Sequence, residues 1–190
     1  TALKVGKATE KSYQEEYKLV GYFGRINYNY QGRYYLSASI RHEGSSKFGA
    51  DHKWGTFPAV SIGWNLKEES FLKNVRFLSF LKLRAGYGIT GTIPGSPYLS
   101  LNTLDLGGYG YYGGQWTTLL RASSNPNSDL RWEKKKETNI GLDFAFFNDR
   151  ISGSIDWYNR DTDDLIWDYT VSVPPYVKNT ITANAGSIRN

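Results

Sequence analysis

The stretch YFGRINYNYQGRYYLSASIR, residues 22–41, decides how this chain folds. Before Gly32, the apolar side chains Ile26, Tyr28 and Tyr30 alternate with asparagines, and after it apolar and small polar side chains alternate again. A period of two residues is typical of β-strands with one apolar face. The three residues 31–33 are too few for anything but a tight turn, so the stretch predicts two antiparallel strands joined by a hairpin.

The same alternation recurs along the chain. It predicts six strands, over residues 20–30, 34–42, 59–66, 81–90, 138–146 and 151–158, and the start of a seventh near Thr182. Helix periodicity is not prominent, and the high content of aromatic residues (16%) and the 20 glycines suit strands and turns. The sequence therefore predicts an all-β fold.

The connections between these strands alternate in length. Residues 31–33, 67–74 and 148–150 form short connections, of which 67–74 has room for one helical turn. Residues 43–55, 91–133 and 159–180 form long ones. In an antiparallel up-and-down meander, the long connections then gather at one end, as they do on the extracellular side of outer-membrane barrels.

Alternation alone fits two architectures, a soluble β-sandwich and a transmembrane β-barrel. Aromatic residues concentrate at the strand ends, which is typical of the two interfaces of a bilayer, and polar and small residues occupy the opposite face, as in a wet lumen. Since about six strands are fewer than the eight of the smallest single-chain barrels, we expect an antiparallel meander that forms an arc of a large transmembrane β-barrel. The rival hypothesis is a secreted soluble β-sandwich that binds glycans.

Strand parity then predicts which side chains face lipid and which face the lumen. The predicted lipid-facing residues are Val60, Ile62, Leu83, Leu142, Phe144 and Ile155. The predicted lumen-facing residues are Arg25, Asn27, Arg41, Arg84 and Asp143.

Composition excludes several classes of protein. The absence of cysteine rules out disulfides, thiolate metal sites and cysteine nucleophiles. The net charge of +5 is spread along the chain, with one cluster at residues 134–136, so we expect no nucleic-acid partner. No apolar run is long enough for a transmembrane helix. The chain begins at Thr1 and contains no methionine, so we expect it to be processed or part of a longer protein.

The polar residues offer no convincing catalytic or metal centre. The two histidines, His42 and His52, lack a third ligand in pattern, and the acidic stretch at residues 161–168 lacks the glycine and terminal glutamate of an EF-hand. GSSKFG, residues 44–49, joins two strands rather than a strand and a helix, so we expect a structural role and no phosphate site. No nucleophile motif is present. We expect no enzyme, no cofactor and no metal.

The best ligand candidate is GGYGYYGGQWTT, residues 107–118. Tyr109, Tyr111, Tyr112 and Trp116 can stack on sugar rings or peptide side chains, and the neighbouring glycines permit close backbone approach. The alternative is that these rings pack against another part of the protein or a partner.

Several segments of the sequence resemble those of SusC/RagA-type TonB-dependent transporters of the Bacteroidetes. They are YFGRINYNYQGRYYLSASIRHEGSSKFG (22–49), WGTFPAVSIGW (54–64), LKLRAGYGITG (81–91), NPNSDLRWEKKKETNIGLDFAFFNDRISGSIDWYNRDTDDLI (125–166) and NAGSIRN (184–190). Their order and spacing match from about Tyr13 onward. Glu43 departs from the aspartate common in the family, and residues 91–133 match only in length and style.

The resemblance implies that residues 1–190 are a partial barrel domain, without the N-terminal plug and the C-terminal strands. It implies a location in the outer membrane, in contact with lipid, and active import of oligosaccharides or oligopeptides. It also implies a SusD-like surface lipoprotein over the loops, and energy supplied by TonB through the plug region.

Overall fold

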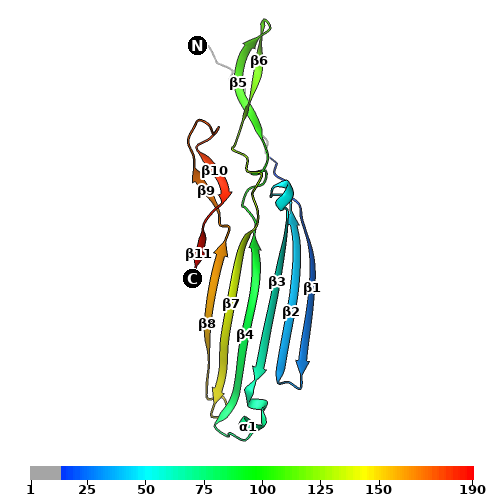
Figure 1. The fold of residues 1–190 in the computed structure, drawn as a ribbon, viewed down its shortest axis with the longest axis vertical. Helices are drawn as coiled ribbons and strands as arrows, with labels where there is room; N and C mark the ends of the chain where they lie inside the picture. Colours follow the sequence, from blue (N-terminus) through cyan, green and yellow to red (C-terminus); the bar gives the residue numbers. More distant parts are fainter. Residues whose placement is uncertain (1–13) are drawn as a thin grey trace, which may run out of the picture.

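The computed structural model describes residues 14–190 as one long antiparallel sheet with two small hairpins at one end (Figure 1). The seven-stranded sheet has the order β1-β2-β3-β4-β7-β8-β11. Its strands are β1 (Leu19–Tyr30), β2 (Tyr34–Ser45), β3 (Trp54–Asn65), β4 (Leu78–Thr92), β7 (Glu133–Phe146), β8 (Ile151–Asp163) and β11 (Ser187–Arg189). The hairpins are β5 (Leu104–Tyr112) with β6 (Gln115–Ala122), and β9 (Ile166–Thr170) with β10 (Thr180–Asn184).

This topology confirms the predicted all-β meander. No second sheet packs against the large one within residues 14–190, so these residues do not form a sandwich. None of the helices in this part of the chain has the length and apolar character needed to cross a membrane.

Two predictions about the strands were wrong. The seventh strand of the sheet begins at Ser187, whereas Thr182 lies in β10 of a separate hairpin. The long strands are also longer than the alternation indicated; β4 has 15 residues and β7 has 14. At the loop end both faces of a strand can be polar because both contact water. The backbone pairing between strands therefore extends past the last residue of the alternating apolar pattern.

The short connections lie at one end of the sheet and the long ones at the other, as predicted (Figure 1). The β1–β2 connection, residues 31–33, places Gln31 and Gly32 at positive φ, 53° and 68°, as the two central residues of the turn that the Arg33 N–H closes onto the Tyr30 carbonyl. The β3–β4 connection contains a 3₁₀ turn, η2 (Leu66–Glu68), and the single helical turn α1 (Ser70–Lys73). We call the two ends the turn end and the loop end.

Glu69 fixes the turn end to the sheet. Its carboxylate accepts hydrogen bonds from the Tyr34 hydroxyl at 2.7 Å and the Trp64 indole at 3.0 Å. These hydrogen bonds, of which the one from Tyr34 has the larger effect, lower the pKa of Glu69 below its ordinary value. The carboxylate therefore stays ionised at neutral pH, and its contribution to stability is lost only as the pH falls through that lowered pKa.

One face of the sheet is apolar and exposed. Cross-strand pairing places Ile26, Ala38 and Val60 in one row, and Leu83, Leu142 and Ile155 in another, on the same side. Ile26, Val60 and Ile155 are 74%, 44% and 64% exposed. We call this the outward face. Six apolar residues that the sequence predicts to face lipid share it: Val60, Ile62, Leu83, Leu142, Phe144 and Ile155.

Two rows of aromatic side chains bracket the outward face of β1–β3. At the loop end, Trp54 stacks on His42 (centroids 4.9 Å apart) and on Tyr22 (6.2 Å). At the turn end, Tyr34 stacks on Tyr30 (6.4 Å) and on Trp64 (6.3 Å).

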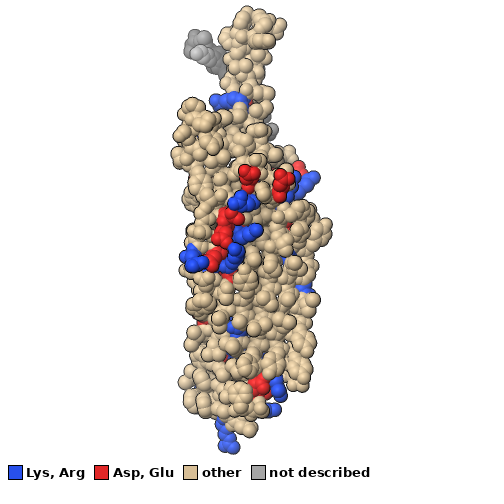
Figure 2. All heavy atoms as spheres, viewed as in Figure 1, with Lys and Arg blue, Asp and Glu red and all other residues tan. Residues whose placement is uncertain are grey.

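The spacing of these rows matches the thickness of a bilayer. Trp54 and Trp64 lie at opposite ends of β3, separated by about 33 Å at roughly 3.3 Å per residue. A tilt of about 35–45° reduces this to about 25 Å of height, the size of the apolar band of outer-membrane barrels. Figure 2 shows charged atoms gathered in a diagonal band toward the loop end and again at the turn end, with almost none across the middle. We infer that the outward face contacts lipid.

The opposite, inward face carries the polar side chains. Arg84 donates two hydrogen bonds to Asp143, at 2.7 and 2.8 Å, and a third to Asp156 at 3.1 Å. Gly141 lies beneath this group, and an added Cβ there would overlap both the Asp156 carboxylate and the Arg84 guanidinium. The predicted lumen-facing residues Arg25, Asn27, Arg41, Arg84 and Asp143 all lie on this face by register.

The hydrophobic core of the described chain lies at the loop end. Phe48, Phe57, Leu130 and Trp132 are each at most 5% exposed. The Trp132 ring packs on Phe48 and Phe57, with centroids 4.8 and 5.1 Å away, and its indole donates to the Lys53 carbonyl at 3.0 Å. The β2–β3 connection and the segment before β7 are thereby packed together.

GSSKFG has the predicted structural role. An added Cβ at Gly49 would overlap the Ser128 carbonyl, so this close approach requires glycine. Lys47 is buried, and its ammonium donates to the carbonyls of Pro94 (2.9 Å) and Gly95 (2.6 Å). Phe48 lies in the core at the loop end, whereas Trp54 belongs to the outward aromatic row.

Val60→Arg and Ser61→Arg, made in the full-length parent protein, test the assignment of faces. Val60 lies midway along β3 on the outward face, and Ser61 points inward. We expect Val60→Arg to cost roughly 2–4 kcal/mol, because it places a charge in hydrocarbon, and to reduce the heat-modifiable folded band on a gel. Ser61→Arg should leave that band largely intact. Equal losses for both variants would contradict the assignment.

Candidate functional site: the inward face and the loop end

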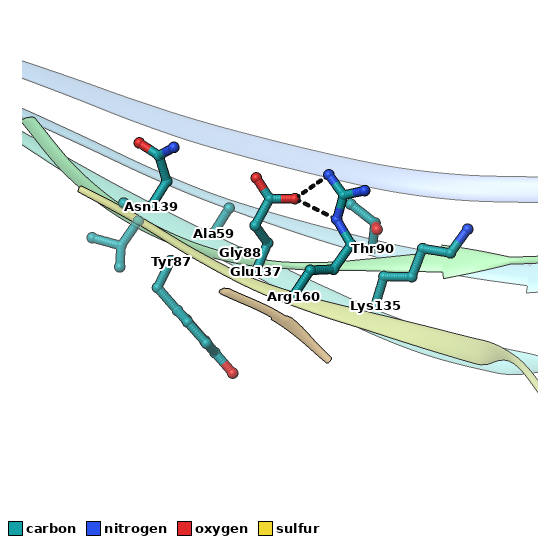
Figure 3. Close-up of a pocket in the computed structure, with 10 residues that line it drawn as sticks. Ala59, Tyr87, Gly88, Thr90, Lys135, Glu137, Asn139 and Arg160 are labelled. Atoms are coloured by element: carbon teal, nitrogen blue, oxygen red, sulfur yellow. Dashed lines mark hydrogen bonds and ion pairs between the residues drawn. The ribbon is translucent and has the colours of Figure 1, made fainter. Parts of the chain in front are cut away.

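A shallow groove runs along the inward face of β3, β4, β7 and β8 (Figure 3). Its volume is about 550 Å³. The inward-facing residues that line it are Ala59, Gly86, Gly88, Thr90, Lys135, Glu137, Asn139 and Arg160, and it also touches Val60 and Tyr87, whose side chains belong to the outward face.

The floor of the groove is almost free of side chains. Gly86 and Gly88 on β4 lie beside Ser61 and Ala59 on β3, so the backbone itself forms the surface. Ala59 and Gly88 are the last pair of the β3–β4 ladder toward the loop end. Beyond this pair the ladder between the two strands ends.

Charged and amide side chains form one wall. Figure 3 shows Asn139, Glu137, Arg160 and Lys135 rising from β7 and β8 on the same side of the sheet, whereas Tyr87 points the other way. Arg160 contacts the Glu137 carboxylate through Nε at 2.8 Å and Nη2 at 2.6 Å. Lys135 lies 3.4 Å from the Glu133 carboxylate. This wall offers both donors and acceptors beside an open backbone floor.

Asparagine side chains fasten the β9–β10 hairpin at the loop end. The buried Asn125 amide donates to the carbonyls of Lys178 and Thr180, both at 2.7 Å, and its oxygen accepts from the backbone N–H groups of Val177 (2.9 Å) and Lys178 (3.1 Å). Asn184 reaches back in the same way, bonding the backbone of Arg131 in both directions.

Further bonds continue this seam. Asn127 donates to the Thr182 carbonyl at 3.0 Å. Arg131 pairs with Asp164 at 2.7 Å, and this hydrogen bond lowers the pKa of the Asp164 carboxyl. The side chains of segment 125–131 thus form hydrogen bonds with the β9–β10 hairpin that the backbone of a neighbouring strand would otherwise provide. The sequence offered only a cluster of asparagines as a signal, so this role was not predicted.

The predicted ligand residues lie on the β5–β6 hairpin, which projects beyond the rest of the loop end (Figure 1). Cross-strand pairing places Tyr109, Tyr111 and Trp116 on one face, with Tyr111 and Trp116 in edge contact at 5.5 Å. Tyr112 pairs with Gln115 and points to the opposite face. Three of the four rings can therefore act together, and all four are exposed.

The aromatic face of this hairpin also includes apolar residues that sequence reasoning missed. Leu104, Leu106 and Leu120 share it, because a bulge between Leu106 and Gly108 shifts the register by one residue. The result is a strip of exposed aliphatic and aromatic side chains.

The weaker metal candidates do not converge. His42 lies in the outward aromatic row and contacts Thr56, whereas His52 ends the 3₁₀ turn η1 (Ala50–His52). Of the acidic residues in 161–168, Asp161, Asp163 and Asp164 pair with different cations. Across residues 14–190, no three histidine or carboxylate side chains are placed to bind one metal ion.

Comparison with known proteins identifies the family. The model of the TonB dependent receptor-like β-barrel matches residues 4–190. SusC, a TonB-dependent receptor of Bacteroides thetaiotaomicron, is 42% identical over 187 residues, which are 95% of this chain and 18% of SusC. The TonB-dependent receptor P39 of Formosa agariphila is 38% identical over 169 residues, covering 88% of this chain and 16% of P39.

This chain belongs to the TonB-dependent receptor family. It therefore forms part of an outer-membrane β-barrel, and it spans less than a fifth of the length of these relatives.

Solved structures agree with this assignment. The RagAB peptide importer in its closed-closed state superposes with a TM-score of 0.82 at 28% identity, covering 91% of this chain and 18% of the other. The siderophore receptor PirA of Acinetobacter baumannii superposes with a TM-score of 0.58 at 16% identity, over 91% of this chain and 24% of PirA, and shows the fold alone.

Asn125→Ala in the full-length parent tests the asparagine seam. The substitution removes the hydrogen bonds between the Asn125 side chain and the backbone of residues 177–180, each worth roughly 0.5–1.5 kcal/mol net. We expect amide hydrogen exchange in residues 177–184 to speed up by about tenfold or more. Asn102→Ala, at an exposed loop position, is the control and should leave this exchange unchanged. An unaltered exchange rate in Asn125→Ala would show that the hairpin is fixed by other contacts.

Proposed function

We propose that this chain is part of the barrel wall and rim of an outer-membrane active transporter that imports large nutrients, either oligosaccharides or oligopeptides. Residues 1–190 would belong to the barrel domain of a longer transporter that also has a plug. A SusD-like lipoprotein would cover the loop end, and TonB would supply energy through the plug.

Two observations together carry this proposal: the membership of the chain in the TonB-dependent receptor family and the polar character of its inward face. A TonB-dependent receptor barrel has a polar lumen, and here the inward face presents a backbone-floored groove with donors and acceptors along one wall. Such a surface suits hydrated solutes or a polar segment of the protein better than a lipid. RagAB is named a peptide importer and SusC a receptor, which supports transport rather than catalysis.

The long connections, residues 46–53, 93–132 and 164–186, would lie outside the cell, because outer-membrane barrels place their longer loops there. The aromatic face of the β5–β6 hairpin would then meet arriving substrate. Tyr109, Tyr111 and Trp116 offer three flat, exposed rings on one side of a strand pair, which suit sugar rings or peptide side chains.

Uptake by cells that express the full-length parent tests the transport proposal. Labelled oligosaccharides and oligopeptides are supplied to matched strains with and without functional TonB. We expect accumulation of one class of nutrient, and only where TonB functions. TonB-independent accumulation, or none of either class, would contradict the proposal.

Alanine variants of the hairpin test the ligand face separately. Trp116→Ala and Tyr111→Ala remove the paired rings, and each should weaken binding of the imported nutrient by roughly fivefold or more, as truncation of a central contact does. Tyr112→Ala removes an equally large ring from the opposite face and serves as the control. If all three variants bind like the wild type, these rings do not contact substrate.

A further inference from the structure

On β7 and β8 the outward face changes from apolar to charged over a short distance toward the loop end. Trp157 on β8 and Ile140 on β7 are paired on the outward face and are exposed to 57% and 45%. Two pairs further toward the loop end, the same face carries Lys136 opposite Asp161, and the next outward pair is Lys134 opposite Asp163. On β11, Arg189 pairs with Asp161 and extends the row.

These five side chains form a charged ladder, defined here as Lys134, Lys136, Asp161, Asp163 and Arg189. Lys136 Nζ lies 2.8 Å from Asp163, and Arg189 Nε lies 2.5 Å from Asp161. Asn159 also donates to the Asp161 carboxylate at 3.3 Å. Lys134 forms no ion pair with residues 14–190, so the ladder retains one unbalanced positive charge.

A hollow of about 400 Å³ opens beside the ladder. It is lined by Lys136, Asp161, Asp163, Ser187, Ile188 and Arg189. The Lys136 side chain is 43% exposed although it has a carboxylate partner, and Arg189 lies on β11, the edge strand of the described sheet. The band of alternating charge in Figure 2 lies over this part of the strands.

The height of the ladder places it among lipid headgroups. Asp161 follows Ile151, the first residue of β8 at the turn end, by ten residues, about 33 Å along the strand and about 25 Å along the membrane normal after tilt. This height equals that of the apolar band of outer-membrane barrels, so a charge here on the lipid-facing side meets headgroups rather than hydrocarbon.

The ladder is local and is not a general property of the rim. At the loop end of β1–β3, the outward positions hold Tyr22, His42 and Trp54, which form the aromatic row. Charge therefore gathers over β7, β8 and β11 alone among the outward faces of the described strands. A merely solvated rim would give no reason for this difference.

We propose that the charged ladder is a docking site for phosphate-bearing headgroups of outer-leaflet lipids. Lys134, Lys136 and Arg189 bind the phosphate oxygens, and Asp161 and Asp163 orient two of these cations. The occupant is a lipid because the site continues directly from the apolar lipid-facing surface. This inference rests on the placement of the barrel in the membrane and not on what the transporter imports.

Native mass spectrometry of the full-length parent tests the proposal. Detergent-purified, delipidated protein is titrated with phosphatidylglycerol as an anionic probe and with phosphatidylcholine as a neutral one. We expect the wild type to retain phosphatidylglycerol preferentially. Replacing all three cations, Lys134→Gln, Lys136→Gln and Arg189→Gln, should abolish this preference, because each charge near a membrane surface changes affinity by roughly fivefold.

Two controls keep the result unambiguous. The inward-face variant Lys82→Gln, Lys135→Gln, Arg160→Gln removes the same charge from the other side and should bind phosphatidylglycerol like the wild type. The single variant Lys134→Gln breaks no ion pair, so it tests the site without disturbing the sheet and should lose about fivefold in affinity.

Three outcomes would overturn the proposal. They are an unchanged preference in the triple ladder variant whose folded band is intact, an equal loss in the inward-face variant, and displacement of the lipid by inorganic phosphate. The last outcome would indicate a site for a free anion instead of a lipid.

Discussion

The structure depends on one constraint, which is that backbone N–H and C=O groups in hydrocarbon must be paired within the protein. Each unpaired group costs several kcal/mol there, so only helices and closed sheets span a bilayer. The long antiparallel ladders of β1–β4, β7 and β8 satisfy this constraint strand by strand. The outer strands of the described sheet are β1 and β11. Because successive side chains of a strand point to opposite faces, apolar residues such as Val60 and Ile155 lie on the outward face, and polar residues such as Arg84 and Asp143 lie on the inward face.

Beyond the aromatic rows the constraint relaxes, and other interactions take over. Water can satisfy the backbone at the loop end, so segments there need not form long ladders. Phe48, Leu130 and Trp132 form a compact core, and Asn125 and Asn184 join segments that no regular ladder connects. The barrel wall is thus held by backbone pairing, whereas the rim is held by packing and by side-chain hydrogen bonds. This division leaves the β5–β6 hairpin free to present its aromatic face to solvent or to a partner.

The parts that could be predicted from the sequence are those governed by parity. The hairpin around Gly32, the six long strands, the two faces and the alternation of short and long connections follow from a period of two residues and from turn residues. The β5–β6 hairpin was missed because its bulge at Gly107 moves Leu106 and Tyr109 onto the same face although they are three residues apart, which hides the alternation. The seam around Asn125 and the burial of Lys47 could not be predicted, because they depend on segments about 50 residues apart in sequence meeting in space.

The central claim, that the face carrying Ile62 contacts lipid and the face carrying Ser61 does not, is open to a direct measurement. The described chain has no cysteine, so Ile62→Cys and Ser61→Cys can each be introduced into an otherwise cysteine-free full-length parent, labelled with an environment-sensitive fluorophore, and reconstituted in bilayers containing phospholipids brominated on their acyl chains. The account predicts strong quenching of the label at residue 62 and little at residue 61. Equal quenching at both positions, or stronger quenching at residue 61, would contradict it.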